Sequence, residues 1–182
     1  MGYIESGSET LDQNYTEGDG ANSLGQATRL YLSQGFLPTV TGKLTKLEAE
    51  LKVGLGSPSG DIGCFLYDNN GGEPGNPLAT FSVVDASTVT ASFVYYAFTS
   101  AFASAPVITA GVTYHLVLKK TPQDESNYLH VQQKDPGPYA GGYVNYGPDG
   151  SGWTATATVD YNFKQYYTPF NLTAGVSGYF NV

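Results

Sequence analysis

The chain has one cysteine, Cys64, and only 13% of its residues are charged. A single cysteine excludes an intrachain disulfide bond. No apolar run approaches the length of about 18 residues that a membrane-spanning helix needs, so no membrane is expected as a partner. The first residues lack the basic start and apolar centre of a secretory signal. We therefore expect either a protein that leaves the cell by another route, such as inside a virus particle, or one whose signal was removed.

Basic residues are also scarce. The chain has eight Lys and Arg residues and sixteen Asp and Glu residues, which gives a net charge of −8. Five of the acids lie in residues 1–25, where there is no Lys or Arg. A phosphate backbone requires a basic surface, so nucleic acid is excluded as a partner.

Glycine and tyrosine are abundant, with 23 and 15 copies, as is typical of strands joined by turns. The clearest pattern lies between Leu44 and Leu55, where apolar residues alternate with Lys and Glu. Period-two alternation predicts a strand with one buried and one wet face. The turn-forming run 56–60 and a second apolar run, 61–67, follow. We expect the two runs to form a hairpin that a second layer must cover.

The whole chain shows about eight to ten strand-like runs separated by turn signals, which favours an antiparallel two-sheet jelly-roll sandwich. We place this all-β sandwich at residues 29–167. Residues 1–28 are polar and acidic and predict an extended N-terminal arm, while residues 168–182 form an uncharged, apolar C-terminal tail.

Several short motifs follow one another in a recognisable order. They are QGFLP at 34–38, the alternating strand 44–55, GSPSGDI at 56–62, YDNNGGEPG at 67–75, YAF at 96–98, AGVTYHLVL at 110–118 and YNFKQYY at 161–167. This set resembles the non-catalytic, carbohydrate-binding-like jelly-roll modules of bacterial surface proteins and tailed-phage virion proteins. The resemblance covers roughly residues 30–167 and implies a binding or structural role.

Two hypotheses are considered. The resemblance, the start of the chain and the two arms motivate the leading one, a phage virion structural protein, either a capsid decoration or a fibre- or tail-attached subunit. Its partners would be other virion proteins or copies of itself. The second is a carbohydrate-binding module for cell-surface or mucosal glycans, which would be secreted or displayed at the cell surface.

A glycan site is best placed where aromatic side chains lie among glycines. Sugars stack their C–H faces on aromatic rings, and neighbouring amides and carboxylates bind their hydroxyls. The alternative is that these rings belong to the core or pack on strand edges. The candidate residues are Tyr139, Tyr143, Tyr146 and Trp153, with Asn145 and Asp149 beside them.

An assembly site is the other candidate. An apolar tail and a polar arm suit strand addition to a neighbouring subunit. The alternative is that each folds back and covers an edge of its own domain. The apolar tail residues are Phe170, Leu172, Val176, Tyr179 and Phe180.

No catalytic constellation is found, so the sequence predicts neither an enzyme nor a cofactor. His115 and His130 lie in strands and are interpreted as structural or surface residues, and Cys64 as a buried, inert thiol. No metal site is predicted either. The alternative is a calcium site in the loop that holds Asp68, Asn70 and Glu73, although its residues also suit any turn.

Overall fold

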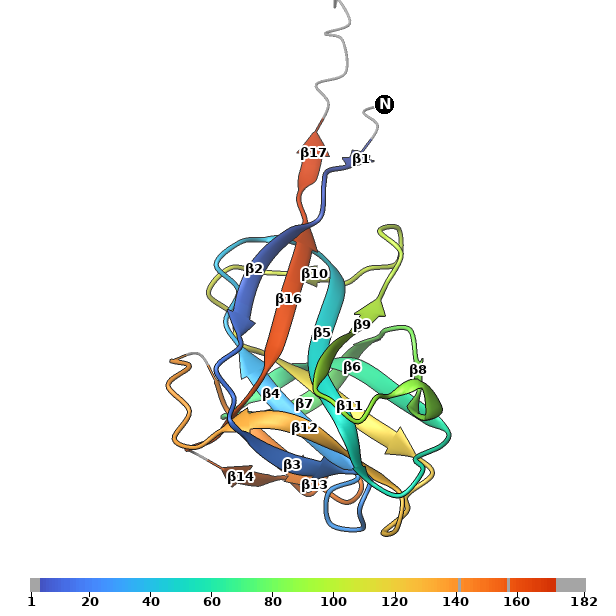
Figure 1. The fold of residues 1–182 in the computed structure, drawn as a ribbon. Coiled ribbons are helices and arrows are strands. Elements are labelled where there is room, and N and C mark those ends of the chain that lie inside the picture. Colours follow the sequence, from blue (N-terminus) through green and yellow to red (C-terminus); the bar gives the residue numbers. More distant parts are fainter. Residues whose placement is uncertain (1–3, 141, 157, 173–182) are drawn as a thin grey trace, which may run out of the picture.

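The computed structural model describes residues 4–140, 142–156 and 158–172. Nearly all regular structure in these ranges is β-strand, and every strand pair is antiparallel. Two sheets pack face to face (Figure 1). The prediction of an all-β, antiparallel two-sheet sandwich is thus confirmed. The described part holds 17 strands rather than eight to ten, because several strands of two or three residues extend the sheets at their margins.

The first sheet has eight strands, with β5 at its centre. On one side of β5 lie β9 and β10, and on the other lie β16 and β12, which continue to β2, β3 and β15. The strands are β2 (Thr10–Tyr15), β3 (Gly20–Leu24), β5 (Gly42–Leu55), β9 (Val94–Thr99), β10 (Val107–Ile108), β12 (Tyr128–Lys134), β15 (Asp160–Tyr161) and β16 (Phe163–Thr168).

The second sheet has seven strands in the order β14-β13-β4-β11-β6-β7, and β8 pairs with β6. One 3₁₀ turn, η1 (Ala86–Thr88), follows β8. The strands are β4 (Tyr31–Phe36), β6 (Asp61–Asn70), β7 (Glu73–Thr80), β8 (Val84–Asp85), β11 (Tyr114–Thr121), β13 (Val144–Gly147) and β14 (Thr154–Thr156).

The two ends of the described chain form a small separate ribbon. β1 (Ile4–Ser6) pairs with β17 (Phe170–Leu172), and this ribbon projects from one end of the sandwich (Figure 1). Both strands come from the segments predicted as arms. The remaining tail residues of the assembly prediction, Val176, Tyr179 and Phe180, lie outside the described residues.

The predicted 43–67 hairpin is wrong in its pairing. β5 alternates as expected, with Leu47, Ala49 and Leu51 buried, but β5 and β6 belong to different sheets. Residues 56–60 therefore form an arch from one sheet to the other. Gly56 and Gly60 take φ angles of 66° and 82°, a region that favours glycine in arches and hairpin turns alike. The residue types of the turn consequently do not reveal which connection forms.

Much of the predicted N-terminal arm lies within the first sheet. β2 pairs with β16 and β3 pairs with β12, and Tyr15 and Leu24 are buried in the core. The segment is polar because each of these strands pairs along one side only and buries few side chains. Residues 10–24 thus belong to the sandwich rather than extending from it.

The core joins the two sheets through apolar and polar contacts. The ring centroids of Phe36 and Phe163 lie 6.2 Å apart across the sandwich. The buried side chain of Gln34 accepts a hydrogen bond from the Tyr161 backbone N–H at 2.6 Å and donates one to Asp160 at 3.2 Å. Because these buried groups are paired, they fix how the sheets sit on each other.

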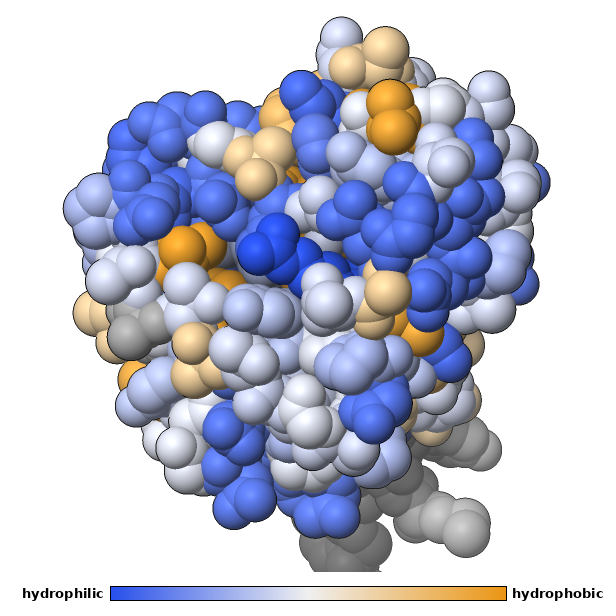
Figure 2. Space-filling model, turned by 90° about the horizontal axis from the view of Figure 1, so that it is seen from below, coloured by the Kyte–Doolittle hydropathy of each residue, from blue (hydrophilic) through white to orange (hydrophobic). Residues whose placement is uncertain are grey.

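The surface beyond the core is mainly polar. Seen from the end of the sandwich opposite the ribbon, hydrophilic side chains dominate, and the apolar areas are small and separate (Figure 2). In the part of the chain that the structure describes, no helix is long and apolar enough to cross a membrane.

Candidate functional site

A cleft of about 540 Å³ lies between the adjoining ends of β6 and β7 and the loop that joins β13 to β14. These segments are distant in sequence and come from opposite margins of the second sheet, yet both line the same cleft. The cleft is lined by Asp68, Asn69, Asn70, Glu73, Pro74, Gly75, Asn76, Gly150, Ser151 and Trp153. We call it the Trp153 cleft.

Trp153 is half-buried and supported from two directions. Its ring meets the ring of Tyr31 edge to face, with centroids 6.3 Å apart. The loop before it is closed by Asp149, whose carboxylate accepts hydrogen bonds from the backbone N–H of Ser151 at 2.9 Å and of Gly152 at 3.1 Å. These bonds lower the pKa of Asp149, which stays ionised at neutral pH. Asp149 thus shapes the loop that presents Trp153.

The opposite wall is a hairpin whose turn is braced by its own side chains. The carboxylate of Asp68 accepts hydrogen bonds from the backbone N–H and the side-chain amide of Asn76. Asn69 Oδ1 accepts from the backbone N–H of Gly72 at 3.0 Å. These bonds hold the polar rim of the cleft in one conformation.

A buried histidine ties this hairpin to the sheet below. His115 Nε2 lies 3.0 Å from Asn69 Oδ1, and His115 Nδ1 lies 3.0 Å from Ser33 Oγ. An amide oxygen only accepts, so Nε2 donates and Nδ1 accepts from the Ser33 hydroxyl. Burial lowers the pKa of His115 to about 4, against a smaller opposing effect of Asp68. This histidine is neutral and satisfied, which makes it structural.

Two of the predicted glycan-binding residues serve the hairpin instead of lining the cleft. Asn145 is fully buried and donates a hydrogen bond from Nδ2 to the carbonyl of Gly72 at 3.0 Å. Tyr143 is 52% exposed and packs so close to Gly72 that a Cβ added to this glycine would lie 3.2 Å from the ring. Both residues therefore contact the β6–β7 turn and help to position this hairpin, without lining the cleft themselves.

Two further predicted residues lie elsewhere. Tyr146 is half-buried against the core, and the Arg29 guanidinium lies over its ring, 5.0 Å from the centroid. Tyr139 lines a separate pocket beside Tyr15 and Leu37. Of the six predicted residues, the structure thus brings only Trp153, with Asp149 in the loop before it, to the cleft.

Sequence reasoning missed Asn69, Asn76 and Ser151 as parts of the same cleft as Trp153. The run from Asp68 to Pro77 showed a loop rich in oxygen-bearing side chains, which was the available signal. What it did not show was the partner loop, because the two segments lie at opposite margins of the second sheet and meet only in the folded chain.

The cleft has the chemistry of a polar binding site with one apolar wall. Asp68 and Glu73 bring carboxylates, Asn69, Asn70 and Asn76 bring amides, and no Lys or Arg of the described chain belongs to its lining. Such a site suits a ligand that carries many hydrogen-bond donors, one apolar face and no negative charge.

The calcium alternative at Asp68, Asn70 and Glu73 finds little geometric support. Both carboxylate oxygens of Asp68 already accept hydrogen bonds from Asn76. Within the described ranges, no group of three or more His, Cys, Asp or Glu side chains is arranged to hold a metal ion. The loop's polar residues instead build its turn and face the cleft.

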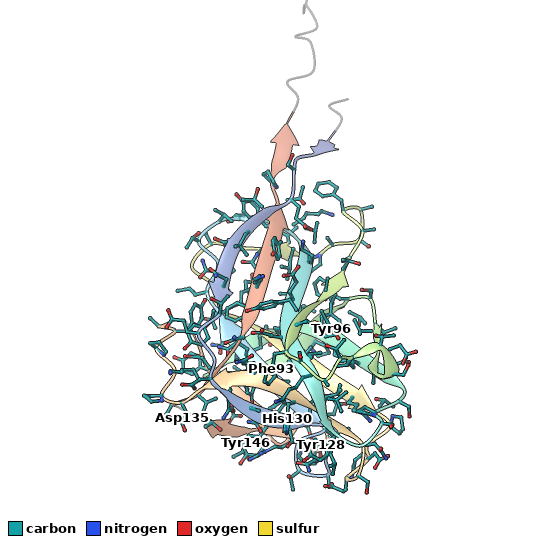
Figure 3. The ribbon with its side chains drawn as sticks, in the orientation of Figure 1. Phe93, Tyr96, Tyr128, His130, Asp135 and Tyr146 are labelled. Atoms are coloured by element: carbon teal, nitrogen blue, oxygen red, sulfur yellow. The ribbon has the colours of Figure 1, made fainter. Side chains whose placement is uncertain are left out.

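The other sequence candidates are placed away from the cleft. Cys64 is fully buried, and burial raises its pKa, which keeps the thiol protonated. Half-buried His130 lies beside Tyr128 on β12, with ring centroids 5.5 Å apart (Figure 3). Phe170 and Leu172 of the assembly prediction belong to β17, whose backbone pairs with β1.

No protein-family model matches the chain. No curated protein sequence matches it either. Among solved structures, it is similar to a family two carbohydrate esterase from Clostridium thermocellum in complex with cellohexaose, with 12% identity and a TM-score of 0.34, over 83% of this chain and 33% of that chain. The chain thus spans about a third of that structure's length. A likeness this low carries no argument about function.

Proposed function

We propose that this protein is a carbohydrate-binding module that takes a neutral glycan in the Trp153 cleft. The observation that carries the proposal is the position of the chain's single tryptophan, half-buried in a cleft whose other side chains are mainly amides, hydroxyls and carboxylates. An apolar ring beside many oxygen and nitrogen groups matches the two kinds of surface on a sugar.

The aromatic wall supports stacking. Trp153 keeps part of its ring exposed, while Tyr31 supports it from the side at 6.3 Å. A ring that is already held in place loses little conformational freedom when a ligand stacks on it. We expect a pyranose ring of the glycan to lie against the exposed part of Trp153.

The polar wall supports recognition of hydroxyl groups. Asn70, Glu73 and Asn76 are exposed and lie on the rim of the cleft. Amides donate and accept, and a carboxylate accepts from a hydroxyl through a charge-assisted hydrogen bond. The hydrogen bonds of Asn69 with Gly72 and His115 keep this rim preformed.

Charge narrows the class of glycan. The lining includes two carboxylates, Asp68 and Glu73, and no basic side chain from the described ranges. A sialylated, uronic or sulfated glycan would therefore meet repulsion without a compensating cation. Neutral glycans, or glycans that carry an amino group, suit the cleft best.

A glycan array with the wild-type protein and Trp153→Ala tests the proposal. We expect the wild type to bind a subset of neutral glycans and Trp153→Ala to lose about two- to tenfold in affinity for them, since aromatic stacking contributes about 0.5–1.5 kcal/mol. Tyr128→Ala is the matched control, because it removes an aromatic ring that belongs to the first sheet and is not part of the lining of the cleft. Equal binding by wild type and Trp153→Ala would contradict the proposal.

We infer a second candidate role, assembly with a neighbouring subunit, from the β1–β17 ribbon. The ribbon projects from the sandwich, and each of its strands pairs along one edge (Figure 1). Open edges are able to add a further strand. No observation on the described residues bears on the narrower prediction of a phage virion, which stays a prediction.

Light scattering tests this second role. We expect the full chain to form an oligomer and Glu5→Pro to shift it toward the monomer, since proline removes a backbone N–H from β1. A full-length protein that is monomeric at high concentration would count against self-assembly.

A further inference from the structure

A second pocket, of about 500 Å³, lies at the margin of the first sheet beside β2. We call it the edge pocket. Its walls come from β2, from the segment after β4 and from the loop before β13, and none of its lining residues belongs to the Trp153 cleft. β2 is the last strand on its side of the sheet, so the pocket lies at an open side of the sandwich.

Two tyrosines form its aromatic wall. The ring centroids of Tyr15 and Tyr139 lie 6.4 Å apart, and Tyr139 packs edge to face on buried Phe163 at 5.3 Å. The Tyr139 hydroxyl donates to Gln13 Oε1 at 3.0 Å and accepts from the Leu37 backbone N–H at 3.3 Å. The position of Tyr139 is therefore set before any ligand arrives.

Tyr15 differs from Tyr139 in one decisive respect. Its side chain is only 7% exposed, yet its hydroxyl has no hydrogen-bond partner among the described residues. Buried hydroxyls are almost always paired, and leaving one unpaired costs about 1–3 kcal/mol. The hydroxyl is itself enclosed, so a ligand in the pocket bonds it only when the Tyr15 ring turns toward the pocket, and that bond would remove the cost.

The strand beside β2 adds a second unpaired group. Gln165 lies directly across from Gln13 in the register of β16 and β2, and Tyr15 lies across from Phe163. Residues two apart on a strand share a face, so these four side chains form one patch. Gln165 is fully buried, and neither atom of its amide has a partner in the described ranges. The patch therefore concentrates unsatisfied polar groups beside the pocket.

The charge around the pocket is negative. Glu17 lines it and is exposed, and no Lys or Arg among the described residues belongs to the lining. Burial raises the pKa of Tyr15, and the charges of Glu17 and Asp160 add to that effect. The Tyr15 hydroxyl thus stays protonated, and the pocket favours a ligand with hydrogen-bond donors and without negative charge.

We propose that the edge pocket is a second ligand site, which takes one neutral hexose or hexosamine unit against Tyr139, and that the Tyr15 ring turns toward this sugar so that its hydroxyl hydrogen-bonds it. The ring face of the sugar meets Tyr139, Leu37 and Pro138, and a sugar hydroxyl or amine reaches Glu17. A sugar hydroxyl both donates and accepts hydrogen bonds, so it can accept from the Tyr15 hydroxyl or donate to it. The choice of a sugar as the ligand rests on the proposed function, whereas the location of the site rests on the edge pocket alone.

Heteronuclear NMR titrations with the methyl glycosides of glucose, galactose, mannose and glucosamine test this second site. We expect at least one of them to shift the backbone amides of Gln13, Thr39 and Ala140, which mark the edge pocket. Those shifts persist in Trp153→Ala, which removes only the binding in the Trp153 cleft. Shifts at Gly75, Asn76 and Ser151 report the Trp153 cleft separately.

Tyr15→Phe is the decisive variant. Removing a hydroxyl without a protein partner leaves the melting temperature unchanged or slightly higher, while sugar binding in the edge pocket weakens about three- to tenfold. Ala140→Phe, at an exposed position in the lining, fills the pocket and abolishes the shifts there.

Three outcomes would overturn the second site. In the first, no glycoside shifts the amides of the edge pocket in the wild-type protein. In the second, the shifts are the same in Tyr15→Phe and Ala140→Phe as in the wild type. In the third, Tyr15→Phe lowers the melting temperature by several degrees. The last would mean that the hydroxyl has a partner within the protein. If the glycosides shift the amides of the edge pocket but not those of Gly75, Asn76 and Ser151, the result counts against the Trp153 cleft and not against the edge pocket.

Discussion

Tyr31 and Trp153 meet edge to face, with ring centroids 6.3 Å apart and planes at 85°. Tyr31 belongs to β4, near the middle of the second sheet, whereas Trp153 belongs to a loop. The contact therefore anchors a loop to the rigid sheet. Lys119 Nζ lies over the same tyrosine ring at 5.1 Å from its centroid, which further orients it.

Tyr31→Ala should weaken glycan binding without unfolding the protein. An edge-to-face aromatic pair contributes about 0.5–1.5 kcal/mol, so we expect a loss of about two- to tenfold in affinity as Trp153 gains freedom. Titration calorimetry with a glycan from the array measures it. Tyr31→Phe keeps the ring and serves as the control. A Tyr31→Ala variant with unchanged affinity would show that the contact does not position Trp153.

Gly71 and Gly72 form a matched pair for testing how the hairpin is held. Both have positive φ, 66° and 100°, but a Cβ on Gly71 meets nothing within 4 Å, whereas one on Gly72 lies 3.2 Å from the Tyr143 ring. We expect Gly71→Ala to cost about 1 kcal/mol of unfolding free energy and Gly72→Ala about 2–3 kcal/mol. Urea unfolding measures both. Equal losses would mean that Tyr143 does not constrain the turn.

His115 makes stability depend on pH. Its pKa is about 4 in the folded protein, below the value of 6.5 for an unfolded chain. Between these values the unfolded state binds a proton that the native state does not, so stability falls as the pH drops from about 6.5 to about 4. The full effect is up to about 3 kcal/mol.

Urea unfolding across this pH range measures the dependence on His115. His115→Gln keeps an amide between Ser33 and Asn69 but does not titrate, so its stability should change less steeply with pH. Parallel curves for His115→Gln and the wild type would contradict the assignment.

Deleting residues 1–28 should destabilise the sandwich itself. The deletion removes β2 and β3, which supply Tyr15 and Leu24 to the core. Burial of these side chains contributes several kcal/mol in total, at about 1.5–3 kcal/mol each for large apolar groups. Circular dichroism melting of the truncated chain checks this. A truncated protein that melts like the full chain would show that the first sheet does not depend on these strands.

Local sequence patterns predicted the strands better than their partners. Alternation of apolar and charged residues placed Leu47, Ala49 and Leu51 in the core, because period two follows from strand geometry alone. The turn at 56–60 did not show whether β6 would return beside β5 or cross to the other sheet. Both connections need glycine at positive φ, and the choice depends on contacts made elsewhere in the fold.

The candidate site was predictable only in part for a related reason. Glycine-rich surroundings pointed to Trp153, and the loop 68–76 was visible as a polar turn. Their meeting was not visible, since it joins segments that lie at opposite margins of the second sheet. Polar composition suggested an extended arm over residues 1–28, because a strand at a sheet margin buries too few residues to show an apolar pattern.

Trp153 offers the most direct test of glycan binding in the cleft, because it is the only tryptophan in the chain. Its fluorescence, excited where tyrosine does not absorb, reports on the cleft alone. We would titrate the wild-type protein with a neutral glycan selected on the array. We predict a saturable change in intensity or wavelength, which the acidic counterpart of that glycan does not produce. Saturable binding by calorimetry with no change in Trp153 fluorescence would contradict the proposed function, since the glycan would then be held elsewhere.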